Sequence, residues 1–227
     1  MILPILALLP AMYLMAYIYK SDQVEKEPKG LLAKIFLFGM ISTIPTMIIG
    51  LILEALLGSL FSPDSIVYKF LDMFIAVALV EEFWKRWAAK KAWNHPAFNY
   101  RFDAVVYCVS AALGFAALEN ILYVMSGGLS VAVLRALLAV PSHAIDGVIM
   151  GIFFGQAKIC EKIGDESGER MFWRLSLLLP MLAHGFYDFC LVSESVFLDL
   201  LFIIFVAVID VWAVKYIKRA AAEDERI

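Results

Sequence analysis

The chain has 227 residues, of which 63% are hydrophobic and 18% are charged, and its mean hydropathy is +0.82. A soluble globular domain is nearer half apolar and a quarter charged, so this composition excludes an ordinary water-soluble protein. The 19 basic and 22 acidic side chains give a formal charge of −3, which leaves no basic surplus for nucleic acid. Three scattered cysteines without a CxxC pair exclude a disulfide framework and a zinc ribbon. The composition predicts an all-α protein, a polytopic bundle of helices in the lipid bilayer.

Seven stretches of the chain reach, or nearly reach, the length of a transmembrane helix, which is about 20 apolar residues. They are 2–19, 31–57, 66–84, 103–126, 129–157, 174–193 and 195–214. The weakest are the third, which runs into Glu81 and Glu82, and the sixth, which contains His184 and Asp188. Because no repeat or long linker separates them, residues 1–227 are expected to form a single domain with about seven transmembrane helices.

The distribution of lysine and arginine predicts the orientation of these helices. All but two of the 19, Lys69 and Arg135, lie in the connections 20–34, 85–101 and 158–174 or in the C-terminal tail. Basic residues accumulate on the cytoplasmic side, so the N-terminus is expected outside and the C-terminus inside. The first helix has no basic region before it and no A-x-A cleavage site, so it is expected to be retained.

Ionisable side chains lie inside several of these apolar stretches, where each is costly and by default marks a functional site. The main groups are Glu81 and Glu82 with Lys85, Glu119 with Asn120, His143 with Asp146, and His184 with Asp188. Depth along the helices places both histidines near mid-membrane, Glu82 in the inner half and Glu119 in the outer half. The spacing therefore permits one polar cluster but does not require it.

Two histidines and several carboxylates from four helices permit two kinds of hydrolytic site. They can bind a divalent metal such as zinc, with His143, His184 and Glu82 as ligands, which would acidify water. They can also act without a metal, when one glutamate is the general base and the histidines with Asn120 stabilise an oxyanion. Both interpretations predict hydrolysis.

Each group also has a structural interpretation. A buried histidine is often only hydrogen-bonded to a neighbouring helix. The paired glutamates with Lys85 fit an ion pair at a helix end with snorkelling side chains, and Glu119 fits a bridge to Arg135. Asp146 and Asp188 fit groups that orient the histidines without touching substrate. Three further acidic residues near span ends are expected to be solvated or structural: Asp103, Asp199 and Asp210.

Four motifs occur in order on four of the expected helices. They are Glu81-Glu82-Phe83-Trp84-Lys85, the segment GFAALENILY from Gly114 to Tyr123, His143 with Gly147-Val148-Ile149-Met150-Gly151, and His184-Gly185-Phe186-Tyr187-Asp188-Phe189. With Tyr17 to Asp22 and Glu27-Pro28 near the start, they resemble the PrsW family of bacterial intramembrane proteases. The resemblance covers most of the chain. The chain is more distantly similar to the type II CAAX-processing proteases and to the non-catalytic APH-type subunit of gamma-secretase.

The resemblance to PrsW implies a peptidase of the bacterial cell membrane that makes the first cut in a single-span anti-sigma factor during stress signalling. The site residues that it implies are Glu81, Glu82, Glu119, His143, His184 and Asp188. That family is usually classed with metallopeptidases, whereas a metal-free glutamate mechanism is argued for the CAAX relatives. Glu119 stands where the CAAX enzymes carry a histidine, so carboxylates would have to complete the shell of any metal.

The implied substrate raises a question of access. An anti-sigma factor is normally cut first on the outer side of the membrane, whereas Glu81 and Glu82 are expected in the inner half. Either their helix is shifted outward, or a water-filled cavity connects the site to the outside.

Other functions fit parts of the pattern. The main alternative is a non-catalytic scaffold that presents helical substrates, as the APH-type relationship suggests, although the paired glutamates argue against it. A b-haem protein with His143 and His184 as axial ligands is disfavoured by the surrounding carboxylates. A proton-coupled transporter would use buried glutamate and histidine, but the chain has no internal repeat of the kind that many transporters show.

Overall fold

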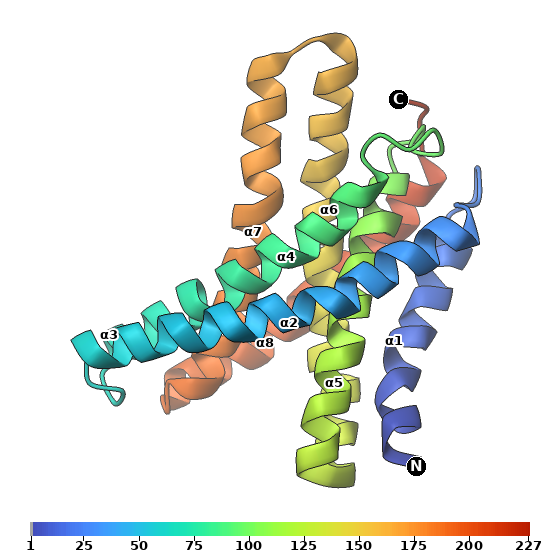
Figure 1. The fold of residues 1–227 in the computed structure, drawn as a ribbon. Coiled ribbons are helices and arrows are strands. Elements are labelled where there is room, and N and C mark those ends of the chain that lie inside the picture. The colour runs from blue at the N-terminus through green and yellow to red at the C-terminus, as the bar shows by residue number, and fades with distance from the viewer. Residues whose placement is uncertain (1) are drawn as a thin grey trace.

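The computed structural model describes residues 2–227, which form helices joined by short loops (Figure 1). In chain order these are α1 (Ile2–Ser21), α2 (Lys29–Leu60), α3 (Ile66–Leu71), η1 (Asp72–Leu79), α4 (Val80–Ala89), η2 (Lys90–Ala92), α5 (Asp103–Leu137), α6 (Ala139–Ile163), α7 (Glu166–Val192) and α8 (Val196–Ala222). Across these residues the β-type pairing amounts to one isolated bridge between Tyr100 and Arg226. The all-α prediction is confirmed.

The helices do not divide the chain quite as the apolar stretches predict. Five segments are long and apolar enough to cross a membrane: Leu3–Ser21, Lys29–Leu60, Asp103–Ile163, Glu166–Val192 and Val196–Ala222. The predicted spans 103–126 and 129–157 fall within the one segment of 61 residues. The predicted span 66–84 is helical but is not among the five, because the chain there forms three short successive segments, α3, η1 and α4. The count of seven crossings and the orientation therefore stay predictions.

The 61-residue segment folds back on itself at Gly128. This residue has φ 75° and ψ −159°, a backbone conformation open essentially to glycine alone. Arg135, beyond the turn, donates from Nε to Oδ1 of Asn120 at 2.9 Å, so the chain on the two sides runs antiparallel. Figure 1 shows the result, with α5 descending to the turn and α6 returning behind it. The turn brings Glu119 and His143 to the same level.

Helix α5 is the central element, and glycines allow its neighbours to approach it closely. A Cβ built on Gly114 of α5 would lie 2.0 Å from the carbonyl oxygen of Phe36 in α2. A Cβ on Gly147 of α6 would lie 2.8 Å from Cα of Val109 in α5. Small residues at such contacts let helix backbones pack tightly in membranes. This packing holds α2 and α6 against the two sides of α5.

The helix that carries the paired glutamates continues well past them. The π-helical segment η1 leads directly into α4, which ends only at Ala89. Glu81 is 7% exposed and Glu82 is fully buried, so neither side chain snorkels to an interface. The predicted ion pair with Lys85 is therefore present, but inside the bundle and not with snorkelling side chains at a helix end. π-helical turns within α-helices occur frequently at functional sites.

Candidate active site

All six sequence-predicted site residues meet in one polar cluster between four helices. They are Glu81 and Glu82 of α4, Glu119 of α5, His143 of α6, and His184 and Asp188 of α7. The two imidazole rings lie with their centroids 5.4 Å apart, nearly perpendicular to each other. Glu82 and Glu119, which were expected at different depths, are linked through Lys85 and His143. Their placement together is a structural fact, whereas their catalytic roles stay predictions.

Lys85 occupies the centre of the cluster. Its Nζ donates to Oε1 of Glu82 at 2.7 Å and to Nδ1 of His143 at 2.9 Å, and lies 3.1 Å from Oε2 of Glu81. The side chain is fully buried and its ammonium lies over the ring of Phe115, 4.7 Å from the centroid. An ammonium group can only donate hydrogen bonds, so Nδ1 of His143 is the acceptor. The sequence indicated the pairing of Lys85 with the glutamates, but not its contact with a histidine.

His184 is held between two carboxylates. Its Nδ1 lies 2.8 Å from Oε1 of Glu82, and its Nε2 lies 3.1 Å from Oδ2 of Asp188, one turn further along α7. Because carboxylates accept hydrogen bonds, this arrangement places a hydrogen on each ring nitrogen. Binding of a cation through either nitrogen would displace that proton. The expectation that Asp188 lies where it can orient His184 agrees with this geometry.

His143 makes a matching contact on the α5 side of the cluster. With its Nδ1 accepting from Lys85, its Nε2 donates to Oε2 of Glu119 at 2.9 Å. The same carboxylate oxygen accepts from Arg135 at 2.7 Å, so the predicted bridge between Glu119 and Arg135 is present. Arg135 also holds Asn120, whose amide donates to the backbone of α1. Asn120 therefore supports the site from outside instead of pointing toward it.

The donor atoms of the cluster suit a divalent metal. Oxygen or nitrogen atoms of Glu81, His143 and His184 lie within 4.8 Å of one another, and all three residues are buried. Two histidines with one glutamate form a ligand set found in catalytic zinc sites, which keep a position open for water or substrate. The predicted set contained Glu82 in place of Glu81. In the structure Glu82 instead groups with His184 and Asp146.

A cavity of about 530 Å³ reaches the cluster from one side and contains Glu81 and Glu119 in its wall. Helix α2 forms one wall, and η1 with the part of α5 that precedes Gly128 forms the other. Residues that line it include Thr43, Thr46, Gly50, Glu54, Asp72, Phe115, Tyr123 and Ser126. The fully buried Glu82 does not line this cavity. Of the two adjacent glutamates, it is therefore Glu81 that faces the space where a substrate or water can enter.

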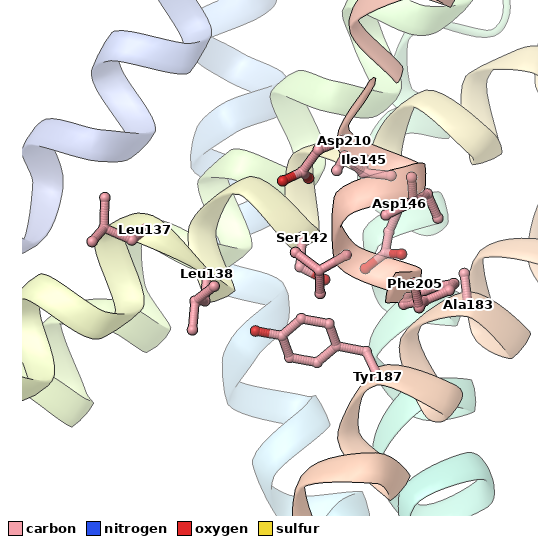
Figure 2. Close-up of a pocket in the computed structure, with 11 residues that line it drawn as sticks. Leu137, Leu138, Ser142, Ile145, Asp146, Ala183, Tyr187, Phe205 and Asp210 are labelled. Carbon is pink, nitrogen blue, oxygen red and sulfur yellow. The ribbon is translucent and has the colours of Figure 1, made fainter. Parts of the chain in front are cut away.

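Asp146 closes the opposite side of the cluster. Figure 2 shows it beside Ser142 and Tyr187, where helices α6, α7 and α8 enclose a cavity of about 10 Å³, roughly the room for one water molecule. Its Oδ2 lies 3.8 Å from Nδ1 of His184 and accepts no hydrogen bond from the described residues. Asp146 was predicted only to support a histidine. Its position three residues after His143, on the same helix face, is the sequence signal that indicates membership of the cluster.

Comparisons with known proteins identify the family of the chain. Residues 27–214 match the family described as "PrsW family intramembrane metalloprotease". The chain belongs to the PrsW family. It is 39% identical to Protease PrsW of Geobacillus kaustophilus (strain HTA426) over 187 residues, which cover 82% of this chain and 78% of the relative. It is 36% identical to Protease PrsW of Oceanobacillus iheyensis over 212 residues, covering 93% and 92%. Identity to Protease PrsW of Bacillus subtilis (strain 168) is also 36%, over 82% and 81%.

Membership of the PrsW family makes the chain a peptidase that works in the membrane of a bacterium. The activity of the family disfavours the non-catalytic scaffold that the sequence left open. The description of PrsW proteins as metalloproteases agrees with the donor set around Glu81, without identifying the metal. No solved structure matches the chain.

Proposed function

We propose that the protein cuts single-span membrane proteins within the bilayer, with Glu81 at the reacting bond, and that its substrate is an anti-sigma factor. One observation carries the assignment of the site. Glu81 lies in the wall of the 530 Å³ cavity and also within 4.8 Å of donor atoms on both histidines. It is therefore the carboxylate that both a substrate and the histidines can reach.

The two adjacent glutamates receive different roles in this proposal. Oε1 of Glu82 accepts from both Lys85 and His184, so Glu82 positions those two side chains and compensates their charge. Glu81 faces the cavity and acts on water or holds the ion that does. His143 and His184 stand where they can either ligate that ion or stabilise an oxyanion. Asp188 and Glu119 orient the two rings.

The same residues serve a site with or without a metal. When bound by Glu81, His143 and His184, a divalent cation supplies polarisation of the scissile carbonyl and acidification of water. Without one, Glu81 is the general base that takes the proton from water. In both cases exclusion of bulk water by the surrounding helices strengthens the electrostatic stabilisation of the developing charge.

The cavity also supports cleavage from the outer side of the membrane. It extends from Glu81 and Glu119 to Glu54 and Ser126, near the ends of α2 and the first arm of α5. The connections that follow those ends, 58–65 and 127–130, contain no lysine or arginine and are expected outside. A cavity open toward that side would admit water and the juxtamembrane part of a substrate. The sequence left two explanations for a cut on the outer side: a helix shifted outward, or a water-filled cavity that reaches the glutamates. The position of this cavity favours the second.

Cleavage in a defined membrane tests the proposal. The purified protein and a tagged single-span protein of anti-sigma type are reconstituted in liposomes, with wild type, His143→Ala and His184→Ala compared, each with and without a strong chelator. His95→Ala is the matched control, because His95 lies exposed in a loop. Wild type and the control should cut the substrate, and the other two variants should not.

The chelator separates the two chemistries. Loss of cleavage that zinc restores would assign a metal, and cleavage that persists after removal of all bound metal would assign the glutamate mechanism. Absence of cleavage by wild type, or full cleavage by both His143→Ala and His184→Ala, would contradict the proposed site.

A further inference from the structure

A second buried group of carboxylates lies far from the candidate active site. Asp22 follows α1, Glu27 precedes α2, and Asp103 begins α5, and one oxygen of each lies within 4.8 Å of the others. Their exposed fractions are 1%, 2% and 0%. Asp103 stands 16 residues before Glu119 on the same helix, which corresponds to about 24 Å at 1.5 Å per residue. Asp103 was expected to be solvated or structural, and its complete burial leaves the structural role.

Positive charge compensates this group only through the nearby ammonium of Lys26, which acts on Asp22 without forming an ion pair with its carboxylate. Among the described residues no lysine, arginine or histidine forms an ion pair with Asp22, Glu27 or Asp103. The nearby Lys26 instead donates to backbone carbonyls at the end of α1, including that of Tyr19 at 2.9 Å. Burial of unpaired carboxylates is expensive.

Unused acceptor atoms point into the group. Both oxygens of the Asp22 carboxylate are buried and have no hydrogen-bond partner among the described residues. Oδ1 of Asp103 is likewise without a partner, whereas its Oδ2 accepts from the backbone of Asn99 and Tyr100 at 3.0 and 2.7 Å. Buried polar atoms are almost always satisfied in native proteins, so three unpartnered carboxylate oxygens in one buried group call for a ligand.

The chemistry of the donors specifies what that ligand is. All are carboxylate oxygens, the ligands preferred by hard cations, and none of the three residues offers nitrogen or sulfur. Calcium binds six to eight oxygens at about 2.3–2.6 Å, so oxygens on one ion lie up to about 5 Å apart. The three oxygens within 4.8 Å of one another satisfy that limit. Zinc, which favours nitrogen and sulfur, suits the histidine cluster better.

We propose that Asp22, Glu27 and Asp103 form a structural binding site for a hard divalent cation, Ca²⁺ or Mg²⁺, separate from the catalytic centre. The ion would tie the end of α1 and the loop before α2 to the first turn of α5. Tyr107 of α5 donates from its hydroxyl to Glu27 and so already orients one ligand. The site would hold α5, and with it Glu119, in fixed register against α1 and α2.

The C-terminal tail joins the same region. Oδ1 of Asp224 accepts from the backbone of Phe102 at 2.8 Å, while its Oδ2 is buried without a partner. Beyond Asp224 the tail runs alongside residues 99–101, where the backbone N–H of Ile227 donates to the carbonyl of Asn99 at 2.8 Å. A cation beside Asp103 would therefore also stabilise the docking of the tail that follows α8.

Thermal unfolding of the full chain in nanodiscs tests the site. CaCl₂, MgCl₂ and KCl of matched ionic strength are compared with EDTA at mildly alkaline pH, where protons compete least with the cation. A cation at about 100 times its Kd should raise the Tm of a chain of this size by about 5–10 °C. A larger rise in Tm with CaCl₂ than with MgCl₂ would assign calcium to the site. A larger rise with MgCl₂ would assign magnesium. KCl should produce no comparable shift.

Three variants locate the effect. Asp22→Asn and Glu27→Gln keep the shape of the side chain but remove its charge, and both should abolish the shift. Glu225→Gln removes an exposed carboxylate from the same end of the molecule and should retain it. The shift should also persist in His184→Ala, which removes a donor from the catalytic cluster. If Asp22→Asn or Glu27→Gln fails to fold, the other variant and the titration of wild type still show whether the cation binds at this group.

Two results would overturn the proposal. The first is a wild-type Tm that neither cation shifts more than KCl does. The second is a shift of equal size in wild type and Asp22→Asn, since that would mean that the cation acts somewhere other than at this group.

Discussion

The ammonium of Lys85 lies 2.9 Å from Nδ1 of His143 and thereby joins two carboxylate–histidine pairs that come from different helices. On one side Glu82 binds His184, and on the other Glu119 binds His143. The buried ammonium of Lys85 therefore links α4, α6 and α7, and it determines which ring nitrogen of His143 carries the proton. The polar cluster depends on this side chain as much as on the motif residues around it.

Removal of Lys85 should destabilise the fold. Lys85→Met leaves Glu81 and Glu82 buried beside each other with one compensating charge fewer, and breaking a buried pair in this way costs about 3–5 kcal/mol. Unfolding in mixed micelles measures the loss. Lys218→Met, at an exposed lysine of α8, should change the free energy of unfolding by less than about 0.5 kcal/mol. Equal stability of the two variants would mean that Lys85 does not hold the cluster together.

The close contact between α2 and α5 should tolerate no added methyl group. Gly114→Ala would place Cβ 2.0 Å from a backbone oxygen of Phe36, so a helix must move. We expect a loss of about 1–3 kcal/mol in unfolding free energy and slower cleavage, because these helices form opposite walls of the cavity. Gly30→Ala is the control, since nothing lies within 4 Å of its added Cβ. A Gly114→Ala protein as stable as Gly30→Ala would contradict this packing.

The general architecture and the composition of the site could be predicted from sequence. Long apolar stretches identify the helices, and ionisable residues within them are rare enough to indicate a functional cluster. The turn at Gly128 falls in the break that the sequence predicts between the spans 103–126 and 129–157. Its positive φ is a property of the backbone that only the folded chain reveals.

The roles of adjacent residues could not be separated by sequence. Glu81 and Glu82 point about 100° apart around their helix, and only the packing of neighbouring helices decides which one faces the cavity. The second acidic group was missed for a related reason. Asp22, Glu27 and Asp103 each lie near a helix end, where solvated carboxylates are ordinary, and it is the tertiary fold that buries them together.

Substrates should enter by the cavity between α2 and α5. A photoreactive amino acid at Met47, which lines the cavity, should cross-link a single-span substrate that is added to the inactive Glu81→Gln protein. The same probe at Ile203, which is 63% exposed on α8 and lies outside the cavity, should cross-link little substrate. Equal yields at the two positions would mean that substrates do not approach through this cavity.

The rate of substrate cleavage by Glu81→Gln in liposomes tests the central claim most directly, because Gln preserves the size of the side chain and removes only its ability to hold charge. The account predicts a loss of at least about 100-fold relative to wild type, the usual minimum contribution of a general base, with Glu225→Gln unchanged. The Tm of the variant should fall by less than that of Lys85→Met, because Lys85 keeps its 2.7 Å hydrogen bond to Glu82, and this comparison separates catalysis from folding. A cleavage rate within a few-fold of wild type would show that Glu81 does not contact the reacting atoms and would contradict the proposed active site.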